Sequence, residues 1–113
     1  MTEVVATDAF VDWYQKLDEP DTAAVYRVVG LLEARGVSLG FPYCSAISNS
    51  NYALRELRVQ SQGQPLRIFY AFDPKRQAVL LLGGNKTGDA RFYETEIPRA
   101  EKLWEQYLQA QRE

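Results

Sequence analysis

Three apolar stretches in the second half of the chain constrain its fold more than any other feature. LRELRV (54–59), LRIFYAF (66–72) and AVLLLGG (78–84) show the two-residue alternation or the dense apolar content of β-strands. The short polar segments SQGQ and DPKRQ separate them and are typical of hairpin turns. Strands joined by such turns lie side by side and antiparallel. The sequence therefore predicts an antiparallel three-stranded meander.

Apolar positions at helical spacing surround this meander in the sequence. TDAFVDWYQKL (7–17) and TAAVYRVVGLLEARG (22–36) each carry apolar residues on one helical face, and a third such stripe follows Pro98. Pro20 separates the first two helices, and Asp21 is expected to cap the second one. A near-continuous apolar strand at 78–84 is typical of a sheet covered on both faces, so we expect helices to cover this sheet.

The remaining segments complete the predicted order of elements. VVA (4–6) predicts a short strand, and residues 36–53, rich in Gly, Pro, Ser and Asn, predict a loop. The order is then β-αα-βββ-α, an α+β fold with a mainly antiparallel sheet, a helical hairpin and a C-terminal helix. The length of 113 residues suits one domain over 1–113.

Charge is unevenly distributed along the chain. Residues 51–93 hold seven cations and three acids, whereas residues 1–50 hold three cations and seven acids, although the whole chain has a net charge of −2. The basic block coincides with the predicted sheet. Such asymmetry can mark a surface for an anionic partner, and the alternative is that these charges occupy solvated strand faces and turns.

Several classes of site have no support in the sequence. The chain has no histidine and only one cysteine, Cys44, which leaves out the commonest general base, an internal disulfide and most zinc sites. It also lacks GxxxxGK[ST], GxGxxG and CxxC motifs. We therefore expect no cofactor and no metal. With no apolar run of about 20 residues and no signal-peptide pattern, we expect a cytoplasmic protein without membrane contact.

Long cationic side chains can converge on one surface of the predicted meander, because neighbouring strands are about 4.8 Å apart. Arg55 and Arg58 lie on its first strand, Arg67 on the second, and Lys86 follows the third. Guanidinium groups pair with phosphates, and a tyrosine such as Tyr93 can stack on an unpaired base. The structural alternative pairs Arg55 with Glu56 or Asp73 at the surface and packs Tyr93 on the last helix.

These residues resemble the RelE/ParE-type toxins of bacterial type II toxin–antitoxin modules, and most closely the HigB-like, phage-derived Gp49-like branch. The stretches that carry the resemblance are LRELRV, LRIFYAFDPKRQAVLLLGGNKTGDARFYE (66–94) and IPRAEKLWEQYL (97–108). The resemblance implies the compact RelE-like fold. It also implies an mRNA interferase that enters the ribosomal A site and cuts mRNA there. A cognate helix-turn-helix antitoxin would neutralise it, and the module would contact operator DNA only through the antitoxin complex.

The resemblance also implies roles for individual residues. Arg67 corresponds to the arginine that stabilises the phosphate, Lys86 to the cation that supports the transition state or the leaving group, and Tyr93 to the tyrosine that stacks on a base or assists proton transfer. Arg55 or Arg58 would take the place of basic residues on the first meander strand. Arg91 would act beside Lys86 or instead of it.

Two departures from the family pattern keep other functions open. The chain is acidic overall, and its loop SAISNSNYA (45–53) lacks the Lys or His that many HigB-like members carry there. One alternative is therefore a ParE-like inhibitor of DNA gyrase that cuts no RNA. Another is a module member that binds its antitoxin but has lost activity.

The stretch LLGGNKTGDAR (81–91) leads to a geometric prediction. Gly83 and Gly84 are expected to end the strand and to allow a sharp turn or the close approach of another backbone. Lys86 would then lie over the sheet face that carries Arg67, and Asp89 would fix the loop through local backbone N–H groups. Arg67, Lys86 and Tyr93 would line one cleft.

Overall fold

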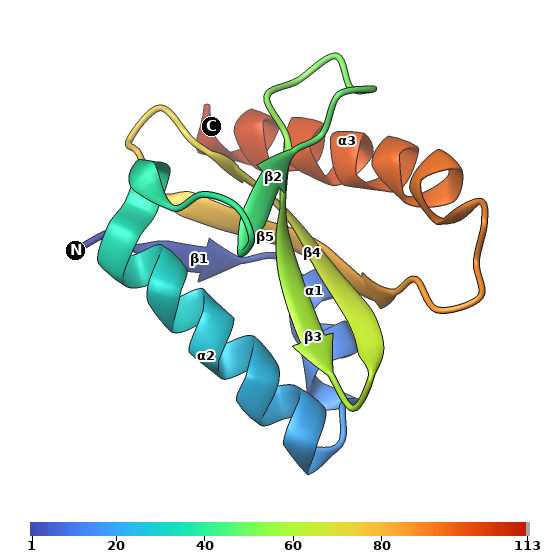
Figure 1. Cartoon of the computed structure of the whole chain (residues 1–113). Helices are drawn as coiled ribbons and strands as arrows, with labels where there is room; N and C mark the ends of the chain where they lie inside the picture. Colours follow the sequence, from blue (N-terminus) through green and yellow to red (C-terminus); the bar gives the residue numbers. More distant parts are fainter. Residues whose placement is uncertain (113) are drawn as a thin grey trace.

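The computed structural model describes residues 1–112 and contains one five-stranded sheet with the strand order β1-β5-β4-β3-β2 (Figure 1). The strands are β1 (Val4–Ala6), β2 (Cys44–Ala46), β3 (Arg55–Ser61), β4 (Gln64–Phe72) and β5 (Ala78–Asn85). β1 pairs with β5 in parallel, and the other neighbours are antiparallel. The predicted meander is confirmed. The β3–β4 turn has positive φ at both Gln62 and Gly63, as two-residue hairpin turns require.

The sheet separates two apolar cores, and helices cover each side of it (Figure 1). On one face, α1 (Asp8–Gln15) and α2 (Glu19–Arg35) pack against residues such as Leu57, Ile68 and Leu80. On the other face, α3 (Phe92–Gln111) packs against Phe69, Ala71 and Leu81, among others. The α+β fold with helices on both faces is thus as expected, and it is consistent with a RelE-like fold.

The second helix begins earlier than the sequence predicts. Asp18, rather than Asp21, is its N-cap, and the Asp18 carboxylate accepts a hydrogen bond of 3.0 Å from the Asp21 backbone N–H. Pro20 therefore lies in the first turn of α2, where its missing N–H would have no partner within the helix anyway. Gly36 ends the helix with φ of +55°, as predicted.

The last helix also begins earlier, at Phe92 instead of near Pro98. Pro98 lies inside α3. The start of the helix is held by the Phe92 ring, which is buried between Gly84 and Phe69. Asp89 fixes the preceding loop as predicted, since its carboxylate accepts a hydrogen bond of 3.0 Å from the Arg91 N–H. This earlier start makes Tyr93 a helical residue.

The segment predicted as a loop contains two short elements. They are a 3₁₀ turn, η1 (Gly36–Ser38), and strand β2, which pairs with β3 through Cys44–Leu57, Ser45–Glu56 and Ala46–Arg55. No apolar period marks three residues such as CSA, so only pairing with a distant strand defines β2.

The glycine pair has a different role from the predicted one. Gly83 and Gly84 lie within β5 and do not end it. A Cβ added at Gly83 would come within 2.3 Å of the Trp13 ring, and one at Gly84 within 2.9 Å of the Phe92 ring. The two glycines therefore make room for aromatic side chains on opposite faces of the sheet, not for a turn or a backbone.

Candidate functional site

Glu56 is the centre of a polar cluster on the face of the sheet that α3 covers in part. This glutamate, in the second position of β3, is only 5% exposed. Its carboxylate accepts hydrogen bonds from the Tyr93 hydroxyl (2.7 Å, Oε1) and from the Ser45 hydroxyl (2.9 Å, Oε2). A buried carboxylate requires such partners because it has lost its contact with water.

Two arginines add positive charge to the same carboxylate. Arg67 Nε lies 3.6 Å from Glu56 Oε1, and Arg58 Nη1 lies 3.9 Å from Glu56 Oε2. Arg58 and Arg67 occupy directly paired positions of β3 and β4, which places both side chains on one face. Arg67 is 5% exposed, and its Nε has no hydrogen-bond partner among the described residues. That N–H is buried beside the Glu56 carboxylate, so Arg67 contributes its positive charge to the site.

Lys86 completes the cluster from the end of β5. Its backbone N–H donates a hydrogen bond of 3.1 Å to the Pro65 carbonyl, which holds the start of the loop against β4. Its ammonium Nζ lies 3.5 Å from the Tyr93 hydroxyl and 5.1 Å from the centre of the Tyr93 ring. Lys86 and Arg67 thus lie on the same face of the sheet, as expected.

The environment shifts the pKa values of Tyr93 and Lys86 in opposite directions. Burial, helped by the hydrogen bond to the Glu56 carboxylate, raises the pKa of the Tyr93 hydroxyl above its usual range. Burial also lowers the pKa of the Lys86 ammonium, and the positive charge of Arg67 lowers it further. Tyr93 therefore keeps its proton at neutral pH, and the adjacent Lys86 releases its proton more easily than an exposed lysine does.

The surface around Glu56 is hollowed in two places, whereas the sequence predicts one cleft. A cavity of about 310 Å³ lies beside Glu56 and Tyr93, and its wall includes Ile47, Asn49 and Ile97. A second cavity of about 210 Å³ is lined by Pro42, Arg58, Gln60 and Arg67. Residues 1–112 contain no group of three or more His, Cys, Asp or Glu side chains that could hold a metal ion.

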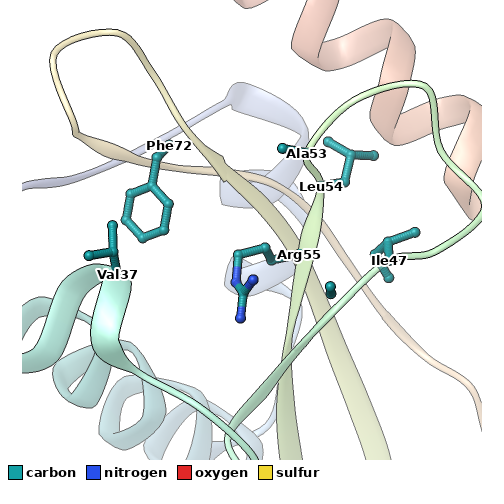
Figure 2. A pocket seen from close by; sticks show the side chains of 7 residues that line it. Val37, Ile47, Ala53, Leu54, Arg55 and Phe72 are labelled. Atoms are coloured by element: carbon teal, nitrogen blue, oxygen red, sulfur yellow. The ribbon is translucent and has the colours of Figure 1, made fainter.

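Arg55 does not belong to this cluster, so the expectation that it shares one surface with Arg58 and Arg67 is wrong. Because side chains alternate along β3, Arg55 lies on the face covered by α2, where its Nη2 is 3.3 Å from Cys44 Sγ. Figure 2 shows the Arg55 side chain extending into a separate cavity of about 380 Å³, near Val37 and Phe72.

Arg91 also lies away from the Glu56 carboxylate. It lies at the start of α3, and its guanidinium makes two hydrogen bonds to the exposed Glu94, of 3.1 and 2.9 Å. The predicted site is therefore divided in the structure. Arg58, Arg67, Lys86 and Tyr93 converge, whereas Arg55 and Arg91 have other partners.

From the sequence, Glu56 is expected only as a possible surface partner of Arg55. The alternation of β3 already placed Glu56 on the face of Arg58, and that is the signal that could have identified it. Its burial depends on Ser45 of the unforeseen β2 and on Tyr93 of the early α3 start.

Comparisons with known proteins agree with the family that the sequence resembles. Residues 12–105 match the family model described as phage derived protein Gp49-like. Two similar proteins come from Mycobacterium tuberculosis (strain ATCC 25618 / H37Rv). The predicted toxin HigB3 is 40% identical over 98 residues, covering 85% of this chain and 84% of that protein. The predicted toxin HigB2 is 35% identical over 99 residues, covering 85% of this chain and 49% of that protein. The chain belongs to the phage-derived Gp49-like family and is a HigB-like toxin of the type II toxin–antitoxin class.

Proposed function

We propose that this toxin is an endoribonuclease that cuts mRNA on the ribosome and that a cognate antitoxin neutralises it. The observation that carries the proposal is the convergence of Arg67, Lys86 and Tyr93 on the buried carboxylate of Glu56. A carboxylate, a neutral phenol, a lysine of lowered pKa and two guanidinium groups supply the acid–base and electrostatic functions that RNA cleavage needs.

The proposed reaction is an internal transesterification. The Glu56 carboxylate accepts the proton of a ribose 2′-OH while the 2′-oxygen forms a bond to the adjacent phosphorus. The positive charges of the Arg67 and Arg58 guanidinium groups stabilise the negative charge that develops on the phosphate oxygens. The bond from phosphorus to the 5′-oxygen breaks, which leaves a 2′,3′-cyclic phosphate and a 5′-OH.

The leaving 5′-oxygen requires a proton, and the pair of Tyr93 and Lys86 is placed to supply it. Tyr93 is protonated at neutral pH and donates to the leaving oxygen. Lys86, whose Nζ lies 3.5 Å from the Tyr93 hydroxyl, then restores that proton. The assignment removes the need for histidine and gives the chain a general base although its loop 45–53 has no Lys or His.

Expression in a bacterial host tests the activity. We expect growth arrest and new mRNA 5′ ends within codons, and each of Arg67→Ala, Lys86→Ala and Glu56→Gln should relieve the arrest. Arg99→Ala is the matched control, because Arg99 pairs with Glu96 on the exposed side of α3. Circular dichroism and co-purification with the antitoxin must show that each variant is folded.

Two results would contradict the proposal. One is full toxicity of the Arg67→Ala/Lys86→Ala double variant. The other is a DNA damage response with intact mRNA, which would indicate a gyrase inhibitor of the ParE type. A co-purifying helix-turn-helix protein, encoded next to the toxin, would identify the antitoxin, and we expect operator DNA to bind only to that complex.

A further inference from the structure

We propose that Phe41 is a stacking platform for a base of the RNA, at the nucleotide next to the phosphate held by Arg58 and Arg67. This inference deepens the proposed function and rests on it. It adds a contact outside the catalytic cluster and concerns how the RNA is bound rather than how it is cut.

Phe41 is an aromatic side chain without a place in either core. It is 76% exposed in an exposed segment, 40–43, and the buried residues Leu39 (2%) and Cys44 (1%) lie at the two ends of that segment. Phenylalanine has no polar atom with which to compensate for exposure to water. The exposed ring lies beside the cationic Arg58, and aromatic rings beside cationic groups are platforms on which unpaired bases stack.

Hydrogen bonds hold the backbone of the turn that carries Phe41. The Tyr43 and Cys44 N–H groups donate hydrogen bonds of 3.0 and 3.2 Å to the Gly40 carbonyl, which closes a tight turn around Phe41. The Arg58 N–H then donates a bond of 2.8 Å to the Tyr43 carbonyl, which joins the turn to β3. A contact residue that is ordered before binding loses little conformational entropy when a ligand arrives.

Arg58 connects the ring to the catalytic cluster. Its guanidinium carbon lies 5.2 Å from the centre of the Phe41 ring, while its Nη1 lies 3.9 Å from Glu56 Oε2. Pro42, next to Phe41, lines the small cavity that Arg58 and Arg67 share. An aromatic ring and two guanidinium groups are thus contiguous beside Glu56, whose Oε1 also accepts the hydrogen bond of Tyr93.

This combination of chemical groups favours single-stranded RNA over a protein partner. Unpaired bases stack on exposed aromatic rings while cationic side chains bind the adjoining phosphates. Stacking contributes about 1–3 kcal/mol per base, and this corresponds to a roughly 5- to 150-fold change in affinity.

A double-mutant cycle between protein and RNA tests the contact. The protein variants are Phe41→Ala, Phe41→Trp and Tyr26→Ala, where Tyr26 is the control because it is also 76% exposed but lies on α2. The substrates are end-labelled mRNAs on programmed ribosomes, either intact or with one abasic nucleotide at each of the three positions on either side of the cut.

The expected result is specific to one nucleotide. Phe41→Ala should cut intact mRNA with a kcat/KM roughly 5- to 150-fold lower, whereas Phe41→Trp and Tyr26→Ala should be close to wild type. At the one position where the base stacks, the abasic substitution should slow the wild type to the rate of Phe41→Ala and leave Phe41→Ala unaffected.

Other results would overturn the inference. Phe41→Ala could cut as fast as wild type, or it could lose the same factor on every abasic mRNA, and neither fits a stacked base. Wild-type cleavage combined with a loss of neutralisation by the antitoxin would assign Phe41 to a protein interface instead. If the wild-type protein cut no mRNA at all, the proposed function itself would fail, and this inference would fail with it.

Discussion

The Tyr93 hydroxyl donates a hydrogen bond of 2.7 Å to the carboxylate of Glu56, and this contact joins the first turn of α3 to the middle of the sheet. The two residues are 37 positions apart in the chain. Helix and sheet therefore have to be assembled before the candidate site exists, so the site forms only in the folded protein.

Replacing Tyr93 with Phe should reduce both stability and activity. The change removes one hydrogen bond to a buried charged group, which costs about 1.5–3 kcal/mol, and it removes the proposed proton donor. The measurements are urea unfolding and single-turnover cleavage of mRNA on ribosomes. Tyr52→Phe is the matched control, because the Tyr52 hydroxyl also bonds to a glutamate, Glu105, at an exposed position away from the cluster. Equal cleavage rates for the two variants would contradict the role of Tyr93.

Removing the charge of Lys86 should not destabilise the protein. Burial and Arg67 lower the pKa of Lys86, so its charged form is disfavoured in the folded state. Lys86→Gln should therefore unfold at an equal or slightly higher urea concentration at pH 7 while it loses activity. As the pH rises towards the usual lysine pKa of about 10.4, the wild-type lysine loses its charge and the difference should vanish. Lys75→Gln, in an exposed turn, is the control. A clear loss of stability in Lys86→Gln at pH 7 would be incompatible with this explanation.

The hydroxyl of Tyr107 should make stability fall in alkaline solution. Burial and the hydrogen bond of 2.8 Å to the Asp73 carboxylate raise the pKa of Tyr107 to about 12. A pKa that folding raises contributes stability that is complete below the unfolded pKa of about 10 and is lost as the pH rises to the folded value. The difference in unfolding free energy between wild type and Tyr107→Phe should therefore shrink between pH 10 and 12. Tyr26→Phe controls for the loss of an exposed hydroxyl, and a constant difference for Tyr107→Phe would refute the assignment.

Replacing Gly83 with alanine should lower the free energy of unfolding. The added Cβ would lie 2.3 Å from the Trp13 ring, so the indole or the strand has to move. Overpacking of this kind costs about 1–3 kcal/mol. Gly30→Ala is the opposite case, because a Cβ there meets nothing within 4 Å and alanine favours the helix by about 1 kcal/mol. Thermal unfolding should rank Gly30→Ala above wild type and Gly83→Ala below it, and the reverse order would contradict the packing.

The predictable part of the fold is the part in which local pattern and long-range packing agree. Alternation in LRELRV and LRIFYAF predicts β3 and β4, because each strand buries one face or both against a helix. The start of α3 follows from tertiary contact instead. Phe92 fits over Gly84 of β5, on the far side of the intervening loop, and this contact overrides the signal of Pro98.

The candidate site was predictable to the extent that its residues lie on those strands. Arg67 and Lys86 follow from the meander. The buried position of Glu56 depends on β2 and on the first turn of α3, and neither has a local pattern that marks its position. The alternation along β3 places Arg55 on the opposite face from Glu56. The length of the arginine side chain is not enough to bring it to the cluster.

The adjacent glycines of β5 determine how closely the two layers of helices approach each other. Trp13 rests on one side of the strand at Gly83, and Phe92 rests on the other side at Gly84. With no side chains between them, the two layers of helices are separated there by the thickness of a single backbone. A side chain at either glycine would therefore displace an aromatic ring from one core only, Trp13 on the side of α1 or Phe92 on the side of α3.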